Sequence, residues 1–171
     1  MRVKGYKLTD ENGQTHGDCQ WGPGVEHTAP GGELCTSEVI HDYADPLLAV
    51  LMNPAHADFG AGMRLWEGEG DLCVEDGTKR GHTWYRTIRE IPVPVVTVNQ
   101  KRRFGILTAK VVAPSWKSIN WLRWADGWLS GNDRTTAAAA YAAAAAAAYA
   151  ADAAGADIKL DLVALAHQAI E

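Results

Sequence analysis

The sequence lacks the features that mark secreted, metal-binding and membrane proteins. Its three cysteines, Cys19, Cys35 and Cys73, are widely spaced, and none forms the C-x-x-C pair that a zinc site or redox motif needs. An odd number of such cysteines favours free thiols in a reducing compartment. The N-terminus has no apolar run, so no signal peptide is expected, and no window holds about 20 strongly apolar residues. We therefore expect a cytoplasmic protein without a membrane segment.

Positive charge is also scarce. The chain has 16 Lys and Arg against 21 Asp and Glu, a net charge of −5, so it carries no electrostatic footprint for nucleic acid. It has no P-loop, no Gly-rich loop leading from a strand into a helix, and no recognisable Ser-His-Asp order. The sequence therefore predicts no nucleic-acid partner, no cofactor and no metal, and it favours a protein that is not an enzyme.

The first part of the chain is typical of strands and turns. Residues 6–9 and 14–16, separated by a turn with Gly13, predict a β-hairpin. Residues 34–37 predict a short extended segment. The alternating patterns of residues 63–69 and 82–91, with turn residues between them, predict an antiparallel pair that ends at Pro92.

One short helix is expected within this β-rich region. Asp45 is a good N-cap and Pro46 suits the first helical position, so the helix should begin there and stop at Pro54. Its apolar residues share one side and are expected to be core; they are Leu47, Leu48, Leu51 and Met52.

The second part of the chain is typical of helices. Phe104, Leu107 and Val111 repeat at helical spacing, and a tryptophan-rich face follows, closed by Gly131. From 137 to 154, fifteen of eighteen residues are alanine, which predicts a helix. An amphipathic helix capped by Asp161 should end the chain. We therefore predict an α+β protein. Its β-rich region, 1–94, has one helix; its helical region, 95–171, has three to four, and the two are packed as one unit.

Two stretches carry a resemblance. Residues 34–46, 64–70 and 76–79 resemble a phage- and prophage-encoded domain of unknown function, over about residues 5–92. His41 and Pro46 match its pattern, whereas Tyr43 stands where the pattern has a second cysteine. The alanine-rich half is similar to helical tails of phage and actinobacterial proteins, some of which are called immunity proteins. The resemblance implies a small phage accessory protein and brings no known activity.

One candidate site surrounds His41. His41, Tyr43 and Ser37 precede the proline-led helix and are candidates to line a pocket, with Glu67 or Glu69 as the acid. By distant analogy to ADP-ribosyltransferases, such a set would hold a nicotinamide dinucleotide. The alternative is that His41 hydrogen-bonds a loop and Tyr43 is packing.

Glu67 and Glu69 form a second candidate. They lie two apart on an expected strand, so their side chains face the same way and repel unless a cation is near. A metal held with Asp71 or His56 would relieve the repulsion, and so would exposure at a strand end.

The helical region offers a third candidate, a docking surface. An alanine helix that packs only one face leaves a smooth side that is easily desolvated, with Tyr141, Tyr149 and Trp128 as binding residues. The leading hypothesis is a non-enzymatic phage accessory protein in the host cytoplasm that binds a host protein or a second copy of itself. The alternatives are a nucleotide-binding protein or ADP-ribosyltransferase-like enzyme using His41, Tyr43 and Glu67, and a virion component.

Overall fold

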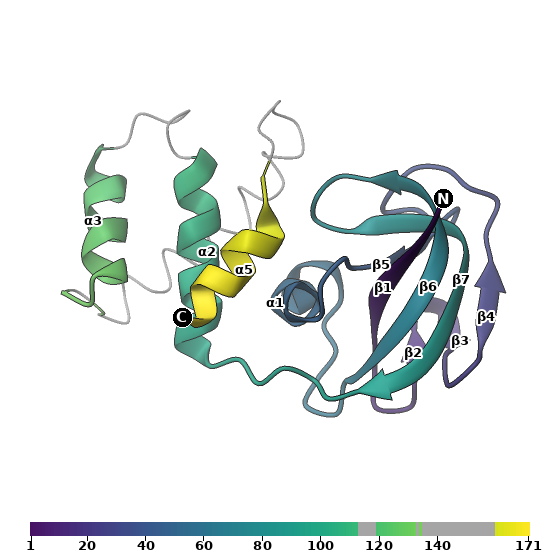
Figure 1. The fold of residues 1–171 in the computed structure, drawn as a ribbon. Helices are drawn as coiled ribbons and strands as arrows, with labels where there is room; N and C mark the ends of the chain where they lie inside the picture. The colour runs from purple at the N-terminus through teal and green to yellow at the C-terminus, as the bar shows by residue number, and fades with distance from the viewer. Residues whose placement is uncertain (113–118, 133, 135–159) are drawn as a thin grey trace. The chain divides into compact units, whose positions relative to one another are not determined.

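The chain folds into two compact units, Met1–Val95 and Val96–Glu171 (Figure 1). The structure is a computed structural model that describes residues 1–112, 119–132, 134 and 160–171. Antiparallel strands and one helix form the first unit, and the described part of the second is helical, so the predicted α+β class is confirmed.

Three long strands form the centre of the first unit. β1 (Arg2–Thr9) pairs with β6 (Arg64–Glu75), which pairs with β7 (Arg80–Ile91), and every pairing is antiparallel. The short strand β4 (Glu26–Thr28) adds to the middle of β7. The β6–β7 register shifts at three places, and such bulges bend a sheet.

The bent sheet closes on itself through a short strand. β5 (Ile40–Asp42) pairs with the start of β7, and Tyr43, the next residue, bridges to Tyr6 on β1. Strands β1, β6, β7 and β5 therefore form a ring of pairing, which Figure 1 shows as a curled sheet with α1 beside it. The ring leaves an interior between segments that are distant in the sequence.

The β6–β7 pair confirms the prediction made for this part of the chain. Gly77 has φ 82° in the connecting turn, a backbone region that favours glycine. The Asp76 carboxylate accepts hydrogen bonds from the backbone N–H groups of Thr78 and Lys79 and holds the turn. β7 ends at Ile91, because Pro92 has no N–H with which to continue the ladder.

The predicted N-terminal hairpin is wrong in its pairing. The turn is present, with Gly13 at φ 79°. However, β1 pairs with β6 over eight residues, whereas β2 (Gln14–Thr15) pairs with β3 (Cys19–Gln20) across the single turn η1 (His16–Asp18). The long β1–β6 ladder buries Leu8 against the core, which two residues of β2 cannot match.

The predicted extended segment at 34–37 is also wrong. These residues form turns, and Cys35 has φ 65°, a left-handed conformation that is incompatible with a strand.

Helix α1 (Pro46–His56) begins where its cap predicts. The Asp45 carboxylate accepts hydrogen bonds from the N–H groups of Leu47 and Leu48. The predicted stop at Pro54 is wrong, because the helix runs on to His56 and ends where the Ala57 N–H donates to the Asn53 carbonyl. A proline in the last turn removes only one hydrogen bond. The four residues predicted as core are buried; they are Leu47, Leu48, Leu51 and Met52.

A buried ionic cluster lies inside the ring of strands. The Asp42 carboxylate receives two hydrogen bonds from Arg80, at 2.9 and 2.8 Å, and lies 2.8 Å from Nε2 of His82. Asp42 and His82 are fully buried, and the Arg80 side chain is 12 % exposed. Gly5 on β1 makes room for the cluster, since a Cβ there would collide with the Asp42 carboxylate.

The second unit contains α2 (Val98–Val112), α3 (Ile119–Leu129) and α5 (Leu162–Ile170). One buried cluster of this unit consists of Ile106, Ala109, Trp121, Ala125 and Trp128. Gly131, at φ 84°, closes α3, and Asp161 caps α5 through the Ala164 N–H, as predicted. The predicted alanine helix at 137–154 lies outside the described residues. Within the described ranges, no helix has the length and apolar character needed to cross a membrane.

Candidate functional site

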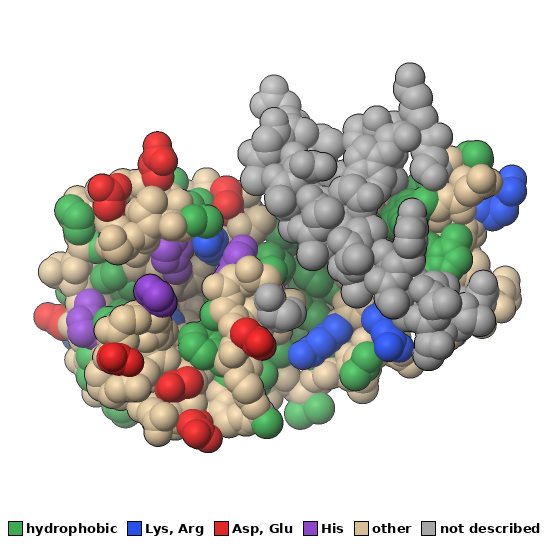
Figure 2. Space-filling model, turned by 180° about the vertical axis from the view of Figure 1, so that it is seen from behind, with side chains coloured by type: hydrophobic (Ala, Val, Ile, Leu, Met, Phe, Trp, Pro, Cys, Tyr) green, Lys and Arg blue, Asp and Glu red, His purple; other side chains and the backbone are tan. Residues whose placement is uncertain are grey.

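A cavity of about 750 Å³ opens in the first unit. Its wall combines segments that are far apart in the sequence: β1, the β2–β3 turn, the loop before β5 and the end of α1. Figure 2 shows histidine side chains gathered around a hollow on this unit. The four histidines that line the cavity are His16, His27, His41 and His56.

The cavity wall is basic and carries no acid. Lys7 and Lys79 line it with the four histidines, and none of its described lining residues is Asp or Glu. This composition contrasts with the net charge of −5 for the whole chain. The positive charge of the described wall comes from the two lysines, because His41 and His56 are neutral at pH 7 with pKa values of about 4.

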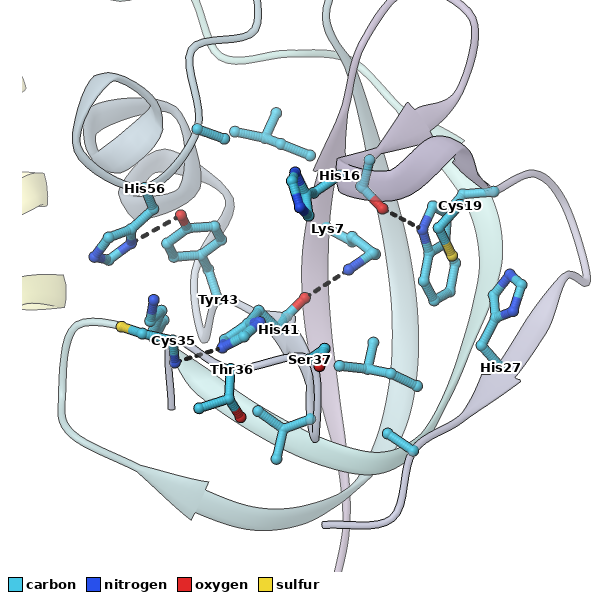
Figure 3. Close-up of a pocket in the computed structure, with 18 of the residues that line it drawn as sticks. Lys7, His16, Cys19, His27, Cys35, Thr36, Ser37, His41, Tyr43 and His56 are labelled. Atoms are coloured by element: carbon cyan, nitrogen blue, oxygen red, sulfur yellow. Dashed lines mark hydrogen bonds between the residues drawn. The ribbon is translucent and has the colours of Figure 1, made fainter. Parts of the chain in front are cut away.

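Lys7 projects from β1 into this cavity (Figure 3). Its ammonium group donates a 2.7 Å hydrogen bond to the backbone carbonyl of His41 and lies 4.4 Å from the centre of the Trp21 ring, a cation–π contact. The residue is only 7 % exposed. Burial lowers the pKa of the Lys7 amine to about 8, and the more distant charge of Asp42 opposes that shift.

His41 is held in one tautomer. Its Nε2 accepts a 3.1 Å hydrogen bond from the backbone N–H of Cys35, so the ring proton resides on Nδ1. Burial, followed by the positive charges of Lys79 and Lys7, lowers the pKa of His41 to about 4. The imidazole is therefore neutral at pH 7.

Tyr43 and His56 form a pair at the other side of the cavity (Figure 3). The Tyr43 hydroxyl lies 3.1 Å from Nδ1 of His56, and the two rings are nearly parallel, at 18°. Burial raises the pKa of Tyr43, so the phenol keeps its proton, and the hydroxyl shares a hydrogen bond with Nδ1 of His56. Burial, followed by the positive charge of Lys79, lowers the pKa of His56 to about 4, so this imidazole too is neutral at pH 7.

The structure brings together only part of the set proposed around His41. His41, Tyr43 and Ser37 line the same cavity, but Glu67 and Glu69 do not. Glu67 forms ion pairs with Lys4 at 2.9 Å and Arg89 at 3.0 Å. Among the described lining residues no acid joins His41, so the carboxylate that the ADP-ribosyltransferase analogy requires is not found in this wall.

The two glutamates also do not form a metal site with the proposed partners. Glu69 pairs with Arg86 at 2.9 Å, and Asp71 pairs with Arg2 at 3.2 Å. Side-chain cations across the strands thus relieve the repulsion that the sequence implies. Over the part of the chain that is described, no group of three or more His, Cys, Asp or Glu side chains is arranged to hold a metal.

Sequence reasoning missed Lys7, Lys79 and the convergence of the four histidines. The only local signal for Lys7 is its place in a strand between Gly5 and Thr9, which share its face of the sheet. Both neighbours are buried, as Lys7 is. Nothing in the spacing of the histidines indicates that they meet.

The docking hypothesis depends mainly on residues that are not described. Tyr141 and Tyr149 lie outside the described residues. Trp128 is 2 % exposed and packs in the core of the second unit. Binding of a host protein or a second copy by the alanine-rich segment stays a prediction.

Comparisons of the chain with family models, with curated proteins and with solved structures give no match. Function therefore has to be inferred from the cavity. Its volume lies in the range of about 300–1,000 Å³ that small-molecule sites occupy. Its lysines can pair with an anion, and its aromatic and imidazole rings can contact a planar group.

Proposed function

We propose that the first unit binds a small organic anion that carries a planar ring, such as a nucleotide. The observation that carries the proposal is the cavity wall, which has two lysines and four histidines but, among its described residues, no carboxylate. In a chain with a net charge of −5, this is a local reversal of sign. Such a reversal favours ligands of negative charge.

Lys7 supports the anionic half of the ligand. A buried ammonium group is unfavourable unless a negative group solvates it, and its hydrogen-bond partner here is a neutral carbonyl. A phosphate or carboxylate within about 4 Å would stabilise the charged amine. The free energy lost on burying Lys7 would then be recovered when the ligand binds.

The rings along the wall support the planar half. Trp21 is contacted edge-on by His27, with ring centres 4.6 Å apart, and both residues line the cavity. His41 is neutral at pH 7 because its pKa is about 4, so it offers hydrogen bonds without adding charge. Trp21 is only 2 % exposed, so a heterocycle would contact the more accessible imidazoles, which it can meet through ring contacts and hydrogen bonds.

Calorimetry with AMP, adenosine and inorganic phosphate tests the proposal. We expect AMP to bind more tightly than either adenosine or phosphate, because only AMP has both the planar ring and the anionic group. Lys7→Met should weaken AMP binding about tenfold or more, the equivalent of one lost charged hydrogen bond. Lys4→Met is the matched control, since Lys4 lies on the same strand but its side chain is 59 % exposed and pairs with Glu67.

Two results would count against this function. One is the absence of heat and of thermal stabilisation with AMP, NAD and benzoate at millimolar concentrations. The other is AMP binding that Lys7→Met and Lys4→Met weaken to the same degree. A ligand at 100 times its Kd stabilises a protein by about 2.7 kcal/mol, so thermal unfolding would detect binding independently.

A further inference from the structure

Lys7 differs from Lys4 and Lys110 in the group that its ammonium contacts. Lys4 pairs with Glu67, and Lys110 pairs with Asp126, so each of these ammonium groups has a carboxylate beside it. Within the described ranges, Lys7 makes no ion pair, and its one hydrogen bond goes to the His41 carbonyl. It lies inside a cavity large enough for a small molecule. Such surroundings are typical of a lysine that reacts as a nucleophile, whereas an ordinary surface lysine is hydrated or ion-paired.

An amine attacks carbon only when it is unprotonated. Burial lowers the pKa of Lys7 to about 8, so roughly a tenth of it is neutral at pH 7, whereas an ordinary lysine is almost fully charged. Among the described residues, no carboxylate forms an ion pair with this amine to hold it in the charged form, and its hydrogen bond goes to a neutral carbonyl. Both features favour nucleophilic chemistry at this nitrogen.

We infer that Lys7 forms an imine with a small aldehyde or ketone that also carries a carboxylate or phosphate. This rests on the proposed function, because the anionic group of the reagent would occupy the basic cavity. It goes further by making the cavity a covalent site for carbonyl acids. Lysines that form Schiff bases use this chemistry elsewhere in proteins.

The step is balanced without any oxidant or reductant. The Lys7 nitrogen lone pair forms a bond to the carbonyl carbon, and the π electrons move to oxygen, which takes a proton. The carbinolamine hydroxyl then takes a second proton and leaves as water while the nitrogen lone pair forms the C=N bond, and the nitrogen releases its last proton. The net reaction is amine plus carbonyl to imine plus water.

Two groups that hold protons line the same cavity. They are the Tyr43 hydroxyl, whose pKa burial raises, and Nδ1 of His41, whose Nε2 accepts from Cys35. Neither group is acidic at neutral pH, so the proton that the leaving hydroxyl needs would come from water.

Reductive trapping with glyoxylate tests the inference. The full chain is treated with glyoxylate and sodium cyanoborohydride at pH 7.5, and peptides are analysed by mass spectrometry. We expect one carboxymethyl group, located on Lys7 and formed at least about tenfold faster than on Lys4. At pH 7.5 about a quarter of an amine with a pKa of about 8 is neutral, against about a thousandth of an ordinary lysine. Thiols of Cys19 and Cys35 also line the cavity, but their adducts with aldehydes contain no C=N bond to reduce.

Two variants separate the imine from a structural effect. Lys7→Arg keeps the positive charge but is not a nucleophile, so labelling should be lost while AMP binding is largely kept. Lys4→Arg should leave the labelling of position 7 unchanged. Labelling that spreads over exposed lysines at equal rates, or that is no slower in total after Lys7→Arg, would overturn the inference.

Failure of imine formation can be distinguished from failure of anion binding. AMP binding without labelling of Lys7 overturns the imine and leaves the anion site standing. Labelling of Lys7 with the same Lys7-to-Lys4 ratio for glyoxylate and for uncharged propanal overturns the requirement for an anion. A higher ratio with glyoxylate supports both parts.

Discussion

The ammonium group of Lys7 donates a 2.7 Å hydrogen bond to the backbone carbonyl of His41 and so ties β1 to β5 across the cavity. The two residues are 34 positions apart in the chain. This contact leaves a cation buried beside a neutral acceptor, and it places the positive charge of Lys7 where it disfavours the charged form of His41. The stability of the first unit should therefore depend on pH at both ends of the scale.

Stability should rise between pH 8 and about pH 10. The folded-state pKa of Lys7 is about 8 against 10.5 for an ordinary lysine, so in this window the unfolded chain binds the proton that the folded chain has lost. The gain is at most about 3 kcal/mol. Urea unfolding at several pH values measures it. Lys7→Met should be more stable than the parent at pH 7 and should lack the rise, whereas Lys4→Met should retain it.

Stability should fall as the pH drops from 6.5 towards 4. The folded-state pKa of His41 is about 4, so below its ordinary value of 6.5 the unfolded chain takes up a proton that the folded chain refuses. We expect about 2 kcal/mol from this residue. His41→Asn should reduce the loss of stability between pH 6.5 and 4, because asparagine does not titrate. The fold should be kept, since the amide oxygen can still accept from the Cys35 N–H. If His41→Asn loses as much stability as the parent between pH 6.5 and 4, His41 is not the cause. The same holds if His16→Asn, at an exposed position, has an equal effect.

Asp42→Asn should destabilise the first unit by about 3–5 kcal/mol. Removing this charge leaves Arg80 almost buried and without its bidentate partner, which is the costly way to break an internal ion pair. Asp71→Asn is the matched control, because the Asp71–Arg2 pair is exposed, with side chains 41 % and 54 % accessible. An exposed pair contributes about 1 kcal/mol or less. Equal midpoints of chemical unfolding for the two variants would refute the structural role of Asp42.

Gly5→Ala should cost about 3 kcal/mol or prevent folding. The added Cβ would overlap the Asp42 carboxylate and the Arg80 guanidinium, which are held by each other and cannot both move aside. Gly22→Ala is the control, since the nearest atom to its Cβ would be the Val25 Cγ2 at an ordinary 3.6 Å. That variant should stay within about 0.5 kcal/mol of the parent. Circular dichroism during thermal unfolding compares the two.

Local signals predicted the elements whose causes lie within a few residues. Asp45 and Pro46 specify the start of α1 because a cap acts on N–H groups two and three positions away. The alternation in β6 and β7, and Gly131 at the end of α3, act over similar distances. The hairpin at Gly13 was predicted wrongly because its turn is local, but the partner of β1 is β6, more than fifty residues away.

The sequence by itself determined the α+β class, most helix and strand positions, and the presence of His41 and Tyr43 beside a capped helix. Tertiary structure alone decided which polar groups meet. Closure of the strand ring placed Lys7 against the His41 carbonyl and Asp42 against Arg80, while cross-strand cations took Glu67 and Glu69 away from the cavity. Capping and alternation are short-range effects, whereas burial and charge pairing depend on contacts between distant segments, which no spacing along the chain records.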